Sequence, residues 1–253
     1  MSSPTTAPTL QICRDCGGGA PVDVHFCPQC TKILSIGRHG DYFAFMGVPR
    51  QLALDPAVLE QRFRALSRQF HPDYFYNATP GERRASLERS SYLNDAYRTL
   101  KNQVSRIIYL LELEGVLTAA DRSETSGSKH VPPALLEEVF ALNEELDDVR
   151  ERRDSGAAAD EWRARLDRAA APIEQKRDEH ERQLVALSAQ WDRVREQPLD
   201  APERRQVLSQ LRDRILERNY ISNLLETIEH ERGFGLLASG SGPEETRSLK
   251  PEA

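Results

Sequence analysis

The stretch Gln69-Phe70-His71-Pro72-Asp73 decides the fold of this 253-residue chain. It closes a helical pattern that begins near Leu59 and repeats apolar residues on one face, namely Phe63, Leu66 and Phe70. Pro72 fixes its own φ and disfavours helical backbone at His71, so the helix must end there. His71 and Asp73 are therefore held in a turn directly after the helix.

The helix before this turn is basic, because it carries Arg62, Arg64 and Arg68 largely off its apolar face. After a turn-rich gap, a second helical stretch ends with Tyr92–Leu100. Helix, His-Pro-Asp turn and helix in this order resemble a J-domain, the module that triggers ATP hydrolysis on DnaK-type chaperones. A basic helix can steer an acidic partner, and the short polar turn can set its register. We therefore expect a chaperone-binding site formed by Arg62, Arg64, Arg68, His71, Pro72 and Asp73.

Two other interpretations of the turn are a plain helix stop and a catalytic pair made of His71 and Asp73. The flanking helices disfavour the plain helix stop. A catalytic pair would need a nearby nucleophile or a glycine-rich phosphate loop, and the sequence offers neither. We therefore predict that the chain is not an enzyme and that it activates the ATPase of a partner.

All four cysteines fall in one early cluster, as Cys13-Arg14-Asp15-Cys16 followed by Cys27-Pro28-Gln29-Cys30. Such clustering favours a metal site over a disulfide framework. Two C-x₂-C turns can surround one ion with four sulfurs, which suits structural Zn²⁺, and iron in a rubredoxin-like site is the alternative. We predict a zinc ribbon over residues 11–36, with a short strand through Val22, Val24 and Phe26. Metal binding would supply most of its folding energy, and we expect it to be separable from the trigger.

The composition favours long solvated helices over a compact α/β enzyme, since 29% of the residues are charged and 7% are aromatic. The net charge of −6 argues against wholesale nucleic-acid binding. No segment approaches the roughly twenty apolar residues of a membrane helix, and the N-terminus lacks the pattern of a secretion signal. We predict a disordered lead over residues 1–10 and a cytoplasmic protein, with the mitochondrial matrix as the alternative.

The fold class that these patterns predict is mainly α: a small ribbon, a J-domain helical hairpin over residues 40–116 and a C-terminal three-helix bundle over residues 132–232. The polar stretch 117–131 is the predicted linker, and residues 233–253 are a predicted disordered tail. The first bundle helix carries a core stripe of Leu135, Val139, Leu142, Leu146 and Val149. Pro172 predicts a kink or two successive helices in the second, and the last helix is expected to end near Glu231. Three such helices can bury their stripes as an antiparallel bundle.

Leu136 and Phe140 lie one turn apart outside the main stripe, with carboxylates at Glu137, Glu144 and Asp148 around them. They either form a binding patch for a basic, partly apolar partner or belong to a broad buried stripe, and helical geometry leaves both open. Tyr220 on the last helix presents the same choice, because a buried hydroxyl needs a hydrogen-bond partner.

A narrower resemblance rests on six segments: Asp41-Tyr42-Phe43, Arg62-Phe63, Gln69–Asp73, Leu93–Lys101, Arg106–Leu111 and Leu142–Asp147. Together they look like the HscB-type co-chaperones of iron–sulfur cluster assembly, over roughly residues 41 to 231. The N-terminal cysteine ribbon also resembles that of the eukaryotic-type members. In that family the last of these segments is part of the scaffold-binding helix.

The resemblance implies that the bundle holds an IscU-like scaffold protein and that the J-domain stimulates a dedicated HscA-like chaperone of the DnaK type. Cluster transfer to an acceptor would follow, and this chain would hold no cluster itself. The family's scaffold-contact positions are Leu136, Phe140, Glu144, Asp148 and Tyr220 here. Two positions depart from the family pattern, because Glu137 replaces an apolar residue and Ala141 an acidic one.

Two other functions are compatible with parts of the pattern. One is a general J-domain co-chaperone for other clients, which would need an open apolar groove in the bundle. The other is a zinc-ribbon regulator of nucleic acid whose heptad-like helices self-associate, which the net charge of −6 disfavours.

Overall fold

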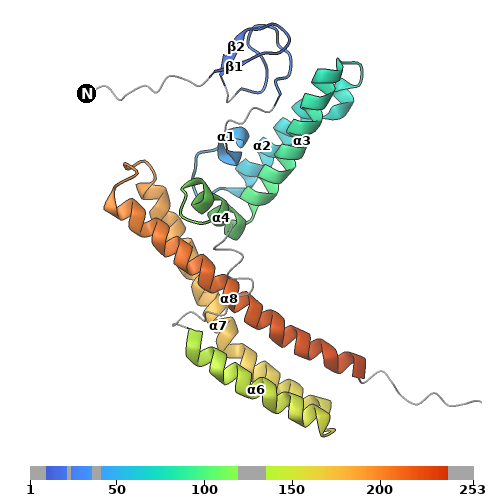
Figure 1. Ribbon diagram of the computed structural model, residues 1–253, viewed down its shortest axis with the longest axis vertical. Helices are drawn as coiled ribbons and strands as arrows, with labels where there is room; N and C mark the ends of the chain where they lie inside the picture. Colours follow the sequence, from blue (N-terminus) through green and yellow to red (C-terminus); the bar gives the residue numbers. More distant parts are fainter. Residues whose placement is uncertain (1–9, 22–23, 36–40, 119–134, 239–253) are drawn as a thin grey trace, which may run out of the picture. The chain divides into compact units, whose positions relative to one another are not determined.

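The computed structural model describes residues 10–21, 24–35, 41–118 and 135–238 (Figure 1). Its mainly α architecture, with a small N-terminal sheet, confirms the predicted fold class. Contacts divide the chain into two compact units, residues 1–118 with 185–212 and residues 119–184 with 213–253. Most of the predicted lead, linker and tail lies outside the described residues. Within the described part of the chain, every helix is too short or too polar to cross a membrane.

The ribbon holds a two-stranded antiparallel sheet of β1 (Leu10–Ile12) and β2 (Gly19–Pro21). The strand predicted through Val24 and Phe26 is wrong, because Phe26 makes only an isolated bridge to Ile33. Val22, the third residue of that predicted strand, lies outside the described residues. The first cysteine turn forms the hairpin loop, so the strands run into it and out of it.

The J-domain begins with α1 (Tyr42–Met46) and α2 (Pro56–Phe70), each preceded by an aspartate cap. A 3₁₀ turn, η1 (Pro72–Phe75), follows, and then α3 (Pro80–Lys101) and α4 (Gln103–Leu113). Figure 1 shows α2 and α3 side by side, as their contacts also show. Thr79 caps α3 in a capping box with Glu82, so the helix starts two residues before the expected Glu82.

The J-domain core is aromatic and aliphatic, and its largest fully buried side chains are Phe43, Met46, Leu52, Leu59, Phe70, Leu93, Leu100, Ile107, Leu110 and Leu111. Residues 185–212, which belong to the same unit, pack against it. The Asp192 carboxylate accepts hydrogen bonds from the backbone amides of Leu52 at 2.7 Å and Ala53 at 2.9 Å. Trp191 donates its indole N–H to the Arg50 carbonyl at 3.1 Å.

The second unit contains α6 (Leu136–Asp154) and the larger parts of α7 (Ala159–Val194) and α8 (Pro202–Ala238). Ion pairs define the directions: Lys176 meets Glu138 and Arg165 meets Glu145, so α6 and α7 are antiparallel. Hydrogen bonds likewise join Arg232 to Asp167 and Arg214 to Gln183, so α7 and α8 are also antiparallel. Consequently α6 and α8 run in the same direction. The whole predicted stripe of α6 is buried.

The prediction of two successive helices around Pro172 is wrong, and so is the predicted end of the last helix near Glu231. α7 passes through Pro172 as one helix, because this proline lies on the exposed side, where carbonyl groups that it leaves without an amide partner can reach water. α8 continues past Glu231 and Gly233 to Ala238. Glu231 is buried between Arg150 at 2.7 Å and Arg153 at 3.0 Å, which secures this end. Each of the two glycines beyond it, Gly233 and Gly235, costs the helix only about 1 kcal/mol.

Candidate functional site

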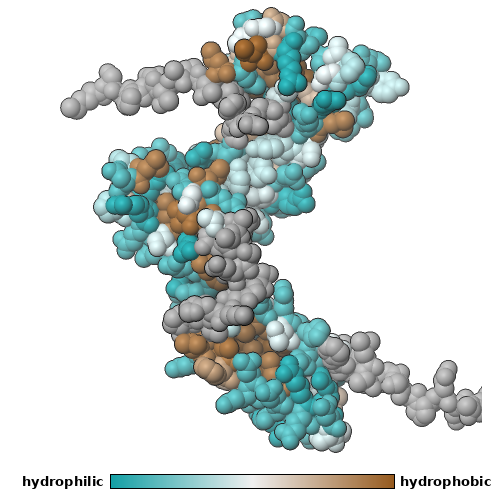
Figure 2. Space-filling view, viewed as in Figure 1, coloured by the Kyte–Doolittle hydropathy of each residue, from teal (hydrophilic) through white to brown (hydrophobic). Residues whose placement is uncertain are grey.

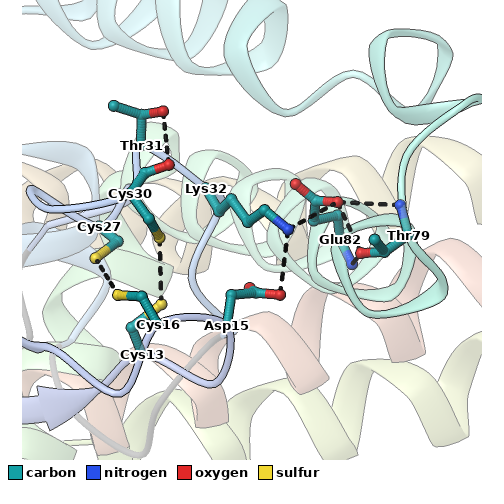
Figure 3. A network of polar contacts seen from close by, with 9 residues as sticks. All are labelled: Cys13, Asp15, Cys16, Cys27, Cys30, Thr31, Lys32, Thr79 and Glu82. Carbon is teal, nitrogen blue, oxygen red and sulfur yellow. Dashed lines mark hydrogen bonds and ion pairs between the residues drawn. The ribbon is translucent and has the colours of Figure 1, made fainter.

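The four cysteine sulfurs form one cluster, with all Sγ atoms within 4.8 Å of one another. Cys13 and Cys30 are 3.7 Å apart at sulfur, and so are Cys16 and Cys27 (Figure 3). Four sulfurs placed tetrahedrally at about 2.3 Å from one ion would lie roughly 3.8 Å apart. The cluster therefore has the size and the donor set of a structural Zn²⁺ site, and Cys13, Cys16, Cys27 and Cys30 would be its ligands.

The two cysteine turns share one hydrogen-bond pattern. Cys13 donates from its amide to Gly18 and accepts from Gly17, both at 2.9 Å. Cys27 stands in the same relation to Lys32 and Thr31, also at 2.9 Å. Gly17 and Thr31 occupy equivalent places and both have positive φ, 73° and 60°. The ribbon thus presents two equivalent loops to one ion.

The pKa values of the thiols show why the cluster calls for a cation. The backbone amides of Cys30 and Gln29 lower the pKa of Cys27 to about 7, which favours a thiolate ligand. The pKa of Cys30 is instead raised to about 12: the Lys32 amide lowers it, but burial and the neighbouring thiols outweigh that effect. Four thiolates can therefore coexist here only around a positive ion.

The His-Pro-Asp turn lies between α2 and α3, with His71 and Asp73 exposed. The Asp73 amide donates to Nδ1 of His71 at 3.3 Å when the imidazole is neutral. When the imidazole is protonated, the same nitrogen faces the Asp73 carboxylate at 3.4 Å. In either state the imidazole stays close to the turn. The base of the turn is anchored, because the Phe70 carbonyl accepts hydrogen bonds from Ser86 at 2.7 Å and Ser90 at 2.9 Å.

The three arginines of α2 are all exposed, but they do not share one face. Arg64 and Arg68 are one turn apart, and Arg68 donates to the Arg64 carbonyl at 3.2 Å. At about 100° per residue, Arg62 lies roughly 160° around the helix from Arg64. Arg64 and Arg68 therefore point away from the core, whereas Arg62 lies beside it, near Gly47, the residue that caps the C-terminal end of α1.

The structure excludes one of the two alternatives for Leu136 and Phe140, which is burial in a broad core stripe. Leu136 is 39% exposed and Phe140 is 67% exposed, so neither belongs to the core. Glu144 and Asp148 continue the same row at intervals of four residues and are also exposed, and Asp148 pairs with Arg165 at 2.9 Å. Figure 2 shows hydrophobic surface near the N-terminal half of α6. We call Leu136, Phe140, Glu144 and Asp148 the α6 ridge.

Tyr220 is half-buried and packs against the bundle core. Burial raises the pKa of its phenol. α6 and α8 run in the same direction, and Arg150 of α6 pairs with Glu231 of α8. Residues that lie equally far before this pair are therefore at the same height along the two helices, and we compare the residues eleven positions before it. Those residues are Tyr220 and Val139, so Tyr220 lies at the height of the apolar end of the α6 ridge.

Sequence reasoning missed two sets of residues near these sites. The first is Arg165 and Arg168, which line a groove between α6 and α7 together with Glu137, Ala141 and Pro172. Both arginines lie off the apolar stripe of α7, so the sequence indicated only that they face solvent. The second is Arg89 with His25, which join α3 to the ribbon through a hydrogen bond of 2.7 Å. Their contact depends on tertiary packing and leaves no mark in the sequence.

An exposed His-Pro-Asp turn between two packed helices, on a chain that continues into a three-helix bundle, defines a J-domain protein with a helical C-terminal part. No protein-family model matches the chain. A curated relative, the co-chaperone protein HscB homolog of Vibrio cholerae serotype O1 (strain M66-2), is 37% identical over 118 residues. That match covers 47% of this chain and 66% of the relative, slightly less than two thirds of its length.

Two solved structures share the fold. The crystal structure of human co-chaperone protein HscB matches with a TM-score of 0.62 and 25% identity, over 88% of this chain and 98% of that one. The chaperone HscB from Vibrio cholerae matches with a TM-score of 0.51 and 27% identity, over 77% of this chain and 99% of that one. In sequence and in fold the chain is therefore similar to HscB co-chaperones.

Proposed function

We propose that this protein is a co-chaperone of iron–sulfur cluster assembly. It would present a cluster scaffold protein to a DnaK-type chaperone and stimulate the ATPase of that chaperone. The observation that carries the proposal is that one chain holds an exposed His-Pro-Asp turn and an exposed apolar patch with an acidic rim, Leu136 and Phe140 beside Glu144 and Asp148. Its relatives are named as HscB co-chaperones.

The J-domain would act on the chaperone by binding, without chemistry of its own. Arg64 and Arg68 offer positive charge on the side of α2 away from the core, and the helix leads directly into His71. Such charges speed the encounter with an acidic surface, and a short ordered turn then fixes the register. Arg62, Pro72 and Asp73 complete the proposed chaperone-binding set. Stimulation would follow if the docked turn favours the hydrolysing state of the chaperone.

The bundle would hold the scaffold through the α6 ridge and Tyr220. An exposed aromatic side chain ringed by carboxylates is typical of an interface with a basic, partly apolar partner. Glu137 and Ala141, which depart from the family pattern, both line the α6–α7 groove next to the ridge. Together these two departures leave the net charge of the groove unchanged but move one carboxylate by one helical turn, which would adapt the surface to the chain's own scaffold protein.

A substitution at the turn tests the proposed ATPase stimulation. His71→Gln should abolish stimulation of the partner chaperone's ATPase, while scaffold binding by the same protein is unchanged. His230→Gln makes the same chemical change at an exposed position of α8 and should leave stimulation at the wild-type level. Equal stimulation by the two variants would contradict the assignment of the turn.

A substitution on the ridge tests scaffold binding. Phe140→Ala removes a largely exposed ring, so it should leave the fold intact and weaken scaffold binding by about 2 kcal/mol, roughly thirtyfold in Kd. Val185→Ala, at an exposed apolar residue of α7, is the matched control and should leave Kd unchanged. Calorimetric titration of the full chain with the scaffold measures both. If the scaffold does not bind and an unfolded client does, the protein is a general J-domain co-chaperone.

We also propose that the metal is Zn²⁺ held by the four cysteines and that the chain holds no cluster itself. Elemental analysis of the purified protein should give about one zinc per chain, and a four-cysteine iron site would instead show sulfur-to-iron absorption in the visible range. The proposed compartment is the cytoplasm, with the mitochondrial matrix as the alternative, and fractionation of host cells distinguishes the two.

A further inference from the structure

The ribbon packs on the residue that ends α2. Phe70 is fully buried and immediately precedes His71. The His25 ring meets the Phe70 ring edge-on at 4.9 Å between centroids, and the Phe26 ring lies at 6.2 Å. Two of the rings around Phe70 therefore come from the ribbon. They belong to the segment that leads directly into the second cysteine turn.

A buried arginine of α3 ties the same region together. Arg89 is 3% exposed and donates to the Leu34 carbonyl at 2.6 Å and the Ser35 carbonyl at 3.4 Å, while its guanidinium meets Nδ1 of His25 at 2.7 Å. The guanidinium also lies 5.6 Å from the Phe70 ring centroid. A buried guanidinium is costly unless its donors are satisfied, and here the acceptors come from the ribbon.

The ribbon also reaches the helix that follows the turn. Lys32, two residues after the last cysteine, pairs with Asp15 at 3.4 Å and approaches Glu82 at 4.0 Å (Figure 3). Glu82 accepts from the amide of Thr79 at 3.0 Å and from its hydroxyl at 2.7 Å. The contacts in Figure 3 thus run from Asp15 and Lys32, which lie one and two residues from a cysteine in the chain, to the N-terminal cap of α3.

These contacts bracket the His-Pro-Asp segment, residues 71–79. One set holds its beginning at Phe70 and the other holds its end at Thr79. Between them, η1 buries none of its residues, and Tyr74 and Tyr76 are 73% and 80% exposed. The segment therefore buries little of its own surface. Arg83 of α3 donates to its Tyr76 carbonyl at 3.4 Å and its Ala78 carbonyl at 3.1 Å, so its geometry depends on α3 and on its two ends.

We propose that the metal-bound ribbon is a clamp that positions the His-Pro-Asp segment for chaperone docking, with His25 and Lys32 as its positioning residues. The inference rests on the proposed function for its effect on the chaperone, but not for its effect on the segment. It revises the sequence-based expectation that the ribbon is separable from the trigger. A four-residue core with a metal cannot keep its shape once the metal leaves, so metal loss would release Phe70 and the α3 cap together.

Hydrogen exchange of the backbone amides in residues 71–79 tests the clamp without any partner. In the metal-bound full chain, His25→Ala should speed this exchange about three- to tenfold. This is the range expected when one aromatic pair is lost. Lys32→Ala should have a smaller effect, since the Lys32 contacts are exposed. Arg14→Ala, at an exposed residue of the same ribbon, should have none.

A second variant separates packing from folding of the ribbon. His25→Phe keeps a ring against Phe70, so its exchange should stay closer to wild type than that of His25→Ala. Metal content is measured for each variant. If His25→Ala retains the metal and the exchange is unchanged, the clamp is overturned. If it loses the metal, the proposal requires that chelated wild type shows the same faster exchange, and unchanged exchange there overturns it.

Chaperone stimulation by the same variants adds the functional readout. Stimulation should fall in the order Arg14→Ala, Lys32→Ala, His25→Ala, while scaffold binding stays constant. Wild-type protein that fails to stimulate any chaperone would contradict the proposed function. The exchange data would still show whether the ribbon positions the His-Pro-Asp segment. Faster exchange with undiminished stimulation would overturn the docking role of the clamp.

Discussion

The cysteine ribbon and the three-helix bundle are both small, and their interiors differ in kind. Among the described residues, the ribbon core contains four that are buried, of which two are cysteines. The bundle core contains eleven such residues, all apolar and contributed by three helices and by Leu135 directly before α6. Apolar burial grows with the number of side chains that leave water, so the bundle can fold on its core. The ribbon cannot, and its shape must come from a metal and from contact with the J-domain.

This difference separates the two proposed roles physically. The bundle would hold its partner on a surface that a robust core supports. The ribbon would act as a removable brace for a segment that packs poorly by itself. Metal-dependent effects should therefore appear at the His-Pro-Asp segment and not at the α6 ridge.

Metal removal should have the largest effect. A chelator that strips the ion should unfold residues 10–35 completely, because four adjacent thiols lose their shared charge partner. The helical signal in circular dichroism should persist, since α6, α7 and α8 do not depend on the metal. Acidification should also release the ion, because protons compete for the sulfurs. Cys27, with its pKa lowered to about 7, should take up its proton after Cys30, whose pKa is raised to about 12. Loss of most helical signal on chelation would refute the contrast.

A cavity in the bundle core should have the next largest effect. Leu166 is fully buried in α7, so Leu166→Ala should lower the free energy of unfolding of the bundle by about 3 kcal/mol. Leu199→Ala, at an exposed leucine, should change it by less than about 0.5 kcal/mol. Denaturant unfolding followed by circular dichroism measures both, and metal affinity should be equal in the two variants.

Loss of the hydrogen bonds that cap α3 should lower the free energy of unfolding by a smaller amount. Thr79→Ala removes the hydroxyl that accepts from the Glu82 amide at 3.3 Å, and should destabilise the J-domain by about 1 kcal/mol. Hydrogen bonds from Thr79 also hold the pKa of Glu82 below its usual range, so this contribution is present near neutral pH and is lost as the pH falls through that lowered pKa. The difference between wild type and Thr79→Ala should therefore shrink in acid, and a constant difference would contradict the role of the carboxylate.

The smallest effect concerns a buried histidine between α7 and α8. Burial and the nearby Arg214 lower the pKa of His180, whose Nε2 lies 3.3 Å from Glu217. The unfolded chain then binds a proton more readily than the folded one, so His180 destabilises the bundle as the pH falls through the usual histidine range. Burial raises the pKa of Glu217. Because Glu217 takes up its proton at a higher pH in the folded protein than in the unfolded chain, its shift stabilises the bundle as the pH falls further, which is opposite to the effect of His180.

A melting series between neutral pH and about pH 5.5 tests this assignment. His180→Gln should flatten the pH dependence of the bundle's melting temperature over that range, which spans the usual histidine pKa of about 6.5. His230→Gln is the matched exposed control and should keep the wild-type slope. Identical slopes for the two variants would remove His180 from the explanation.

Much of the fold could be predicted because its rules are local. The ring of Pro72 disfavours helical backbone at His71, and α2 does end at Phe70. The stripe of α6 follows from helical periodicity, and all five of its predicted residues are buried. The spacing of the cysteines likewise implies a four-sulfur site, and the four Sγ atoms do converge. Each of these inferences needs only neighbouring residues and a backbone geometry.

Other features depend on which surfaces meet. The exposure of Phe140 is decided by where α7 and α8 lie around α6, since its helical position allowed either outcome. Pro172 interrupts the pattern of α7 but not the helix, because it faces solvent.

The chain's local chemistry therefore determines its helices, its turn and its metal ligands, because hydrogen bonding, proline geometry and ligand spacing act within a few residues. The tertiary structure alone places His25 of the ribbon against Phe70 and Arg89, whose positions are 45 and 64 residues further along the chain. No periodicity or motif encodes such a contact, since it arises only when separately formed elements bury their remaining apolar and polar groups against each other.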